Sequence, residues 1–124
     1  MMSDEQIISE IKGLVINKKR FYGFNVCVYE YDDETGENIE DLLESYTCLG
    51  LEETVSRLFD LSIKGYGITH ISVQCSRPWY RGSDIMVIGD YTIRFILLKN
   101  KEMKTNISSN VIDALLERMR GYDI

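Results

Sequence analysis

The sequence predicts an α+β fold, with a single domain over residues 1–124 in which helices pack on one face of a mostly antiparallel sheet of four to five strands. Three stretches repeat their apolar residues at helical spacing, and five others read as strands. The expected order, α-β-β-α-β-β-β-α, has too few helices between strands for a doubly wound sheet. A length of 124 residues with 44% hydrophobic residues suffices for one core, and a single proline argues against a long linker.

Helices are expected at about residues 4–16, 51–64 and 108–120. The first opens with Ser3 followed by Gln6, which is the spacing of a capping box. The second and third are each followed by a glycine, the residue that most often ends a helix. The side chains predicted to share one face of the second helix are Leu51, Val55, Leu58, Phe59, and Ser62 or Ile63.

Strands are expected where β-branched and aromatic residues gather, at about residues 23–31, 44–50, 68–76, 84–88 and 91–98. The pair Gly89–Asp90 between the last two strands predicts a type II′ hairpin. The β-α-β step through the second helix predicts one parallel pair with a right-handed crossover. Residues 39–46 fit helical spacing as well as strand, and the run is too short to decide.

The charge balance limits the kinds of partner that the chain could bind. The net charge is −6, and the excess of acid lies in the first half: residues 1–62 hold 14 acids and five Lys or Arg, whereas residues 63–124 hold six acids and nine Lys or Arg. Nucleic-acid binding is therefore not expected, because it depends on a cationic field. No apolar run is long enough to cross a bilayer, and the acids near the N-terminus have the wrong sign for a secretory signal, so a cytoplasmic location without membrane contact is expected.

The residues that most often bind metals or act as nucleophiles are few and scattered. The chain has three cysteines, Cys27, Cys48 and Cys75, and one histidine, His70, with no C-x-x-C pair. We expect reduced, mostly buried thiols and neither a metal nor a cofactor. Strand alternation would place His70 and Cys75 on opposite faces, and the phosphate-binding and nucleophile-elbow motifs are absent. An enzyme is therefore not expected.

The stretch QCSRPWYRGSD, residues 74–84, contains the only tryptophan and the only proline of the chain. Trp, Tyr and Arg are enriched at binding hot spots, and the same residue types can stack on a ring and hold a phosphate. The alternative is that Trp79 packs on the core while Pro78 ends a strand. The candidate partner- or ligand-binding residues are Arg77, Trp79, Tyr80, Arg81 and Arg94.

An acidic run between residues 30 and 44 has no basic residue. Its acids, which form the candidate acidic interaction surface, are Glu30, Asp32, Asp33, Glu34, Glu37, Glu40, Asp41 and Glu44. An EF-hand loop is excluded, because placing Gly36 at position six puts Tyr31 where the first aspartate is required. The run is therefore a solvated hairpin turn, a surface that meets a basic partner, or a Ca²⁺ or Mg²⁺ site looser than an EF-hand.

These observations favour a small acidic cytosolic protein that acts through protein–protein interaction against a partner with a basic surface. Immunity proteins and phage-encoded anti-defence proteins have the same general profile, so the leading expectation is an inhibitor or antagonist. One alternative is a binder of a small anionic ligand, such as a nucleotide, held by the segment around Trp79. Another is a structural subunit whose partner is a second copy of itself, a homo-oligomer.

Overall fold

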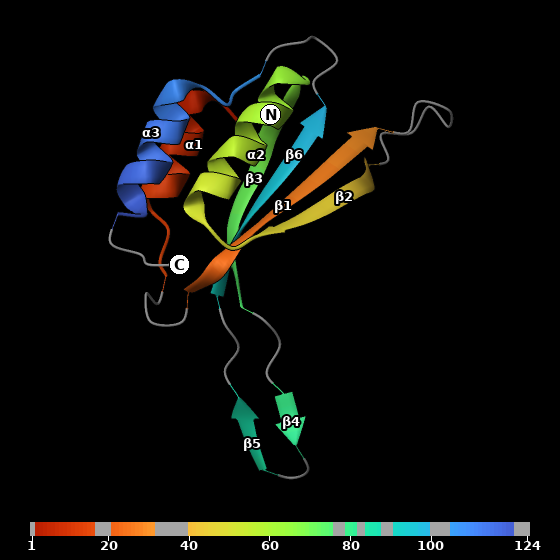
Figure 1. Ribbon diagram of the computed structural model, residues 1–124, viewed down its shortest axis with the longest axis vertical. Coiled ribbons are helices and arrows are strands. Elements are labelled where there is room, and N and C mark those ends of the chain that lie inside the picture. Colours follow the sequence, from red (N-terminus) through yellow and green to blue (C-terminus); the bar gives the residue numbers. More distant parts are fainter. Residues whose placement is uncertain are drawn as a thin grey trace.

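The structure is a computed structural model that describes residues 2–16, 21–31, 40–75, 79–81, 84–87, 91–99 and 105–120. Its helices and strands are α1 (Asp4–Lys12), β1 (Phe21–Tyr31), β2 (Glu40–Cys48), α2 (Leu51–Ile63), β3 (Tyr66–Cys75), β4 (Trp79–Arg81), β5 (Asp84–Val87), β6 (Tyr91–Lys99) and α3 (Ser109–Arg118). Figure 1 shows the helices on one side of a four-stranded sheet, with the small β4–β5 sheet beyond one end. The predicted α+β class is confirmed.

The main sheet is mixed, with the strand order β2-β1-β6-β3. The two outer pairs are antiparallel, but the central pair, β1 and β6, is parallel. The prediction of a mostly antiparallel sheet therefore holds only for the outer pairs. The parallel pair was expected between the strands that flank α2; instead β2 and β3 lie at opposite edges of the sheet, and α2 crosses from one edge to the other.

The predicted hairpin across Gly89–Asp90 is wrong. β5 pairs with β4, through Trp79 with Val87 and Arg81 with Asp84, and these two strands form a separate sheet. β6 instead lies between β1 and β3, so both of its edges are occupied and neither is left for β5. The expected order therefore places one strand too many in the main sheet.

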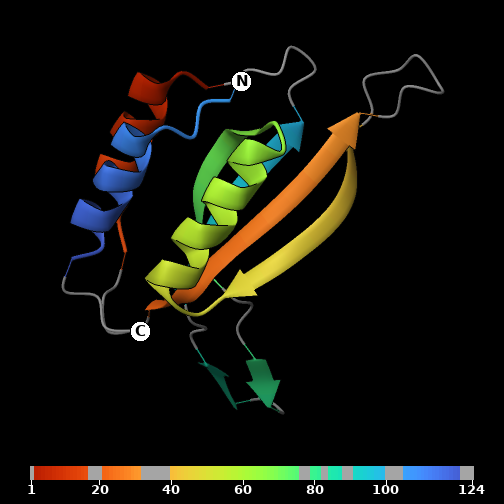
Figure 2. The same ribbon diagram turned by 45° about the horizontal axis from the view of Figure 1, so that its top comes forward.

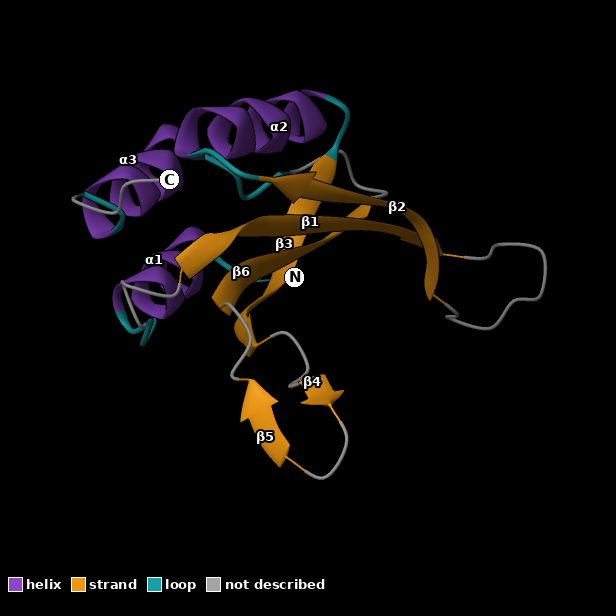
Figure 3. Ribbon diagram, turned by 60° about the horizontal axis from the view of Figure 1, so that its bottom comes forward, coloured by secondary structure: helices purple, strands orange, loops and turns teal. Residues whose placement is uncertain are grey.

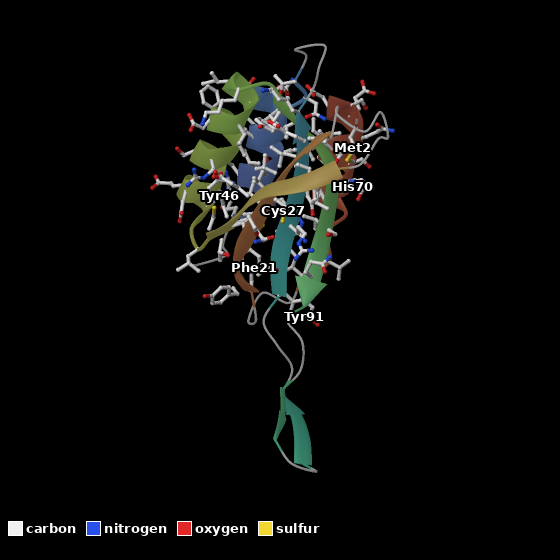
Figure 4. The ribbon with its side chains drawn as sticks, turned by 90° about the vertical axis from the view of Figure 1, so that its right-hand side faces the viewer. Met2, Phe21, Cys27, Tyr46, His70 and Tyr91 are labelled. Carbon is white, nitrogen blue, oxygen red and sulfur yellow. The ribbon has the colours of Figure 1, made fainter. Side chains whose placement is uncertain are left out.

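The hydrophobic core lies between the main sheet and the helices. Phe24 on β1 and Phe95 on β6 are fully buried, and their rings stack with centroids 6.3 Å apart. α2 contacts β1, β2 and β3, α1 contacts β3, and α3 packs along α1. Figures 2 and 3 show α2 lying over the sheet and α1 beside α3. The opposite face of the sheet, turned toward the viewer in Figure 4, carries no described helix.

The expected helix and strand limits are shifted in two places. α1 ends at Lys12 rather than near residue 16, and Gly13 is its C-cap. At the start of α1 the predicted capping box is present, and Gln6 N donates to Ser3 Oγ at 3.2 Å. β2 begins at Glu40, so the ambiguous residues 40–46 form strand. Pairing with β1 decides between helix and strand for these residues, because a helix of one or two turns is unstable without packing against other elements.

The outer edge of β3 is closed by the side chain of Asn106, which lies just before α3 and is 7% exposed. Asn106 Oδ1 accepts from Ile68 N at 2.7 Å, and Asn106 Nδ2 donates to Ile68 O at 2.7 Å and to Met2 O at 2.6 Å. One amide thus replaces a neighbouring strand at Ile68 and also holds the residue before α1.

Candidate interaction surfaces

The residues predicted around Trp79 do not form one cluster with Arg94. The structure describes the backbone of Trp79, Tyr80 and Arg81 as β4, and Arg77 lies outside the described residues. Arg94 belongs to β6 in the main sheet. β4 has β5 as its described strand partner, so Arg94 and the β4 residues lie in different sheets. Binding at β4 stays a prediction.

The acidic run spans the end of β1 and the start of β2. The acids outside the described part of the chain are Asp32, Asp33, Glu34 and Glu37. The backbones of Glu40 and Asp41 lie on β2, where Asp41 is opposite Glu30. Glu44, also on β2, is exposed.

Glu30 makes an internal hydrogen bond. Its Oε1 accepts from the Tyr66 hydroxyl at 2.8 Å, across the end of the sheet. Burial, together with the carboxylates of Glu30 and Glu44, raises the pKa of Tyr66 to about 12. The Lys99 Nζ lies 5.9 Å from the Tyr66 ring centroid. Glu30 therefore joins β1 to β3, and it is not simply a solvated surface charge.

The outward side of α2 exposes apolar side chains that the sequence pattern placed on the same face as Leu58. Phe59 is 55% exposed and Ile63 is 71% exposed. They are one helical turn apart, so they are neighbours on the helix surface. Glu52, Ser56 and Asp60 share this side of the helix and are also exposed. We call these five residues the α2 outer surface.

The core face of α2 is formed by other residues, namely Thr54, Leu58 and Leu61. Leu58 was among the predicted core residues, and the seven-residue spacing from Thr54 to Leu61 marks this stripe in the sequence. Thr54 was missed because threonine is polar. Its hydroxyl donates to Gly50 O at 2.9 Å, which satisfies the hydroxyl inside the core.

The cationic side chain in the middle of α2 does not belong to the α2 outer surface. The Arg57 guanidinium lies 3.9 Å from the centroid of the Tyr46 ring on β2, a cation–π contact that joins the helix to the sheet. Lys64 follows the helix and lies 3.9 Å from the Asp60 carboxylate, where both groups are exposed. Such an exposed pair is weak, so the α2 outer surface keeps an acidic character.

A second surface is the face of the main sheet opposite the helices, which we call the open sheet face. Its described side chains alternate with the buried ones along each strand. They are Asn25, Cys27, Tyr29, Ser45, Thr47, His70, Ser72, Gln74, Thr92, Arg94, Ile96 and Leu98. The register places Thr47, Asn25, Arg94 and Ser72 side by side in one row across all four strands.

The described thiols are buried, and the nearest hydrogen-bonding groups of Cys27 and His70 are on neighbouring residues. Cys27 and Cys48 are buried free thiols, and burial raises the pKa of Cys48. Cys27 Sγ donates to Asn25 Oδ1 at 2.9 Å, and His70 Nδ1 lies 3.0 Å from Thr69 Oγ1. Within the described ranges, no three His, Cys, Asp or Glu side chains are grouped as metal ligands would be.

None of the helices in the described part of the chain is long and apolar enough to cross a membrane. In comparisons with known proteins, no family model matches the chain, and no curated protein or solved structure matches it either.

Proposed function

We propose that this chain is a small acidic binding protein that acts, as an inhibitor or antagonist, on another protein with a basic surface. The observation that carries the proposal is the α2 outer surface, where Phe59 and Ile63 are exposed beside the carboxylates of Glu52 and Asp60. An apolar centre with a charged rim is the usual composition of a protein–protein interface.

The α2 outer surface is also held rigidly, which favours binding because little order has to be gained in the complex. Leu58 and Leu61 anchor the inner side of the helix in the core. Arg57 holds its flank against Tyr46. The apolar and acidic groups are therefore presented by a fixed helix.

The acids of the run between residues 30 and 44 would steer a basic partner toward the molecule, because long-range attraction raises association rates. The β4–β5 sheet extends beyond the main sheet (Figure 1), which gives the predicted anchor around Trp79 reach toward a partner. Arg77, Tyr80 and Arg81 would contribute guanidinium and phenol contacts there.

The test begins with capture of partners on the tagged full-length protein and their identification by mass spectrometry. Binding of the purified partner is then measured by calorimetry for wild type and for a Phe59→Ser, Ile63→Ser double variant. Removing the two side chains should cost about 2 kcal/mol, or about thirtyfold in Kd, because their apolar area no longer leaves water on binding. Circular dichroism checks that the variant stays folded.

The matched control is Val15→Ser, which changes a residue that is 87% exposed outside α2. It should leave Kd within about twofold of wild type, because isolated exposed apolar residues rarely contribute to binding. Equal affinities of wild type, the double variant and the control would contradict a role for the α2 outer surface.

Steering is tested separately by replacing Asp32, Asp33 and Glu34 with lysine. We expect the association rate to fall strongly at low salt and the difference to shrink as salt increases, because ions screen exposed charges beyond about 8 Å at physiological ionic strength. An association rate that is the same in the variant and in wild type at low salt would show that these acids do not guide the partner.

A further inference from the structure

Arg94 lies in the middle of the open sheet face. Its neighbours along β6, Ile93 and Phe95, are fully buried on the helix side, so alternation directs Arg94 to the opposite side. Across the sheet it is in register with Asn25 on β1 and with Ser72 on β3. Figure 4 shows this face, with Cys27 and His70 marking the strands on either side of β6.

The Arg94 guanidinium has no partner in the described part of the chain. Its Nε is buried without a hydrogen bond, and no ion pair to the residue is present there. The other half-buried arginines are engaged: Arg57 stacks on Tyr46, and Arg118 donates to Leu14 O. A buried donor without an acceptor is costly, and its presence in a folded protein requires an explanation.

The groups next to Arg94 do not supply that acceptor. The Asn25 amide bonds to other groups, because Nδ2 donates to Ser45 Oγ at 3.1 Å and to Tyr46 O at 3.3 Å, and Oδ1 accepts from Cys27 Sγ at 2.9 Å. None of the described side chains of the open sheet face is a carboxylate. Among the described side chains of this face, the charge of Arg94 is therefore uncompensated, although the whole chain is acidic.

A second donor stands beside the guanidinium. Ser72 Oγ accepts from Gln74 Nε2 at 2.9 Å, which leaves the Ser72 hydroxyl hydrogen free to donate toward a ligand. Arg94 and Ser72 are directly opposite in the register. Two adjacent donors with no described acceptor between them form a site that an oxyanion would complete.

We propose that the open sheet face binds a small molecule through an oxyanion, a carboxylate or phosphate group, held by Arg94 and Ser72. The two Nη groups of the guanidinium can donate in parallel, which matches two oxygens of such a group. This site is independent of the α2 outer surface and of the partner proposed for it. It also does not require β4, which belongs to another sheet.

The test is nuclear magnetic resonance of the ¹⁵N-labelled full chain, titrated with sodium phosphate and, separately, with sodium acetate at constant ionic strength. The Arg94 Nε–H signal is assigned by its loss in Arg94→Lys. We expect this signal and the Asn25 and Ser72 amide signals to shift together and to saturate. The anion that saturates at the lower concentration identifies the group as phosphate or carboxylate.

Arg94→Lys should weaken the binding at least tenfold, because lysine keeps the charge but loses the paired donors. The matched control is Arg120→Lys, an exposed arginine after α3, which should leave the titration unchanged. Shifts that stay linear and equal those caused by chloride would overturn the proposal. Shifts of the same signals on diluting the protein without added anion would indicate a carboxylate of a second copy, and would overturn the small-molecule site.

Thermal unfolding of Arg94→Leu without added anion provides a second readout. If the guanidinium serves a ligand, its removal relieves an unpaired buried donor, and the Tm should be equal to or above that of wild type. A Tm several degrees below that of wild type would show that Arg94 is needed for the fold, which would overturn the proposal.

Discussion

Replacing Asn106 with alanine would remove three hydrogen bonds, of which two close the outer edge of β3 and one holds the residue before α1. The side chain bonds to both Ile68 N and Ile68 O, each at 2.7 Å, and to Met2 O at 2.6 Å. Asn106 is 7% exposed, so water has little access to the groups that the variant leaves behind. The Ile68 backbone would then lack partners on its outer side.

The size of the effect follows from the number of bonds. A hydrogen bond of this kind contributes about 1 kcal/mol net, so the Asn106→Ala variant should lose about 3 kcal/mol in its free energy of unfolding. That is a large part of the stability of a small domain, which is about 5–15 kcal/mol. The variant should still fold, with a lower midpoint of unfolding.

Urea unfolding followed by circular dichroism measures this loss, with Asn110→Ala as the matched control. Asn110 is an exposed residue of α3, so the same chemical change there should alter stability by no more than about 0.5 kcal/mol. A loss for Asn106→Ala below about 1 kcal/mol, close to that of the control, would refute the idea that this amide replaces a strand at the edge of β3.

Two further substitutions test the ends of the sheet. Tyr66→Phe removes the bond to Glu30 and should cost about 1.5 kcal/mol at neutral pH in urea unfolding. The pKa of Tyr66 is raised from 10.0 to about 12, so the stability that its hydroxyl provides is present below pH 10 and is lost as the pH rises toward 12. The Tyr66→Phe variant should lack this part of the loss of stability at alkaline pH. An unchanged loss in the variant would contradict the role given to the Tyr66 hydroxyl. Gly23→Ala would place a Cβ 2.7 Å from Cys48 O and should cost about 2 kcal/mol, whereas Gly50→Ala, which meets no atom within 4 Å, should cost about 0.5 kcal/mol as a poorer N-cap. Equal losses in the two glycine variants would show that the close approach at Gly23 is not limiting.

Local signals predicted the helices well and predicted strand pairing poorly. Ser3 and Gln6 specify the start of α1 because a capping box depends on residues three apart. The pairing of β6 depends on β1, about 70 positions earlier in the chain, and no local pattern specifies that partner. A glycine-containing pair between two apolar runs therefore predicted a hairpin at Gly89–Asp90, although β6 finds better-buried partners on both sides.

The composition of the candidate surfaces also depends on contacts between residues far apart in the sequence, which local patterns do not specify. The helical period was loose enough to place Phe59 and Ile63 on one face with Leu58. The structure separates them, because Thr54, Leu58 and Leu61 are buried while Phe59 and Ile63 are exposed. Arg94 was a candidate from the sequence, but it was grouped with Trp79 as part of one anion-binding site. The sheet register instead places it beside residues from β1 and β3.

The two surfaces can serve ligands of opposite charge in one small chain because the core separates them. The two strands from the acidic first half, β2 and β1, lie side by side in the order β2-β1-β6-β3, and the two strands from the more basic second half, β6 and β3, form the other side of the sheet. The two faces of the molecule also differ in charge, with Glu52 and Asp60 on the outward side of α2 and Arg94 on the open sheet face. A helix is about 10 Å across, and the Debye length is about 8 Å at physiological ionic strength, so carboxylates beyond α2 are largely screened from an anion at Arg94. The carboxylates of the α2 outer surface therefore do not oppose anion binding at Arg94, and each surface can be altered without changing the charge that the other presents.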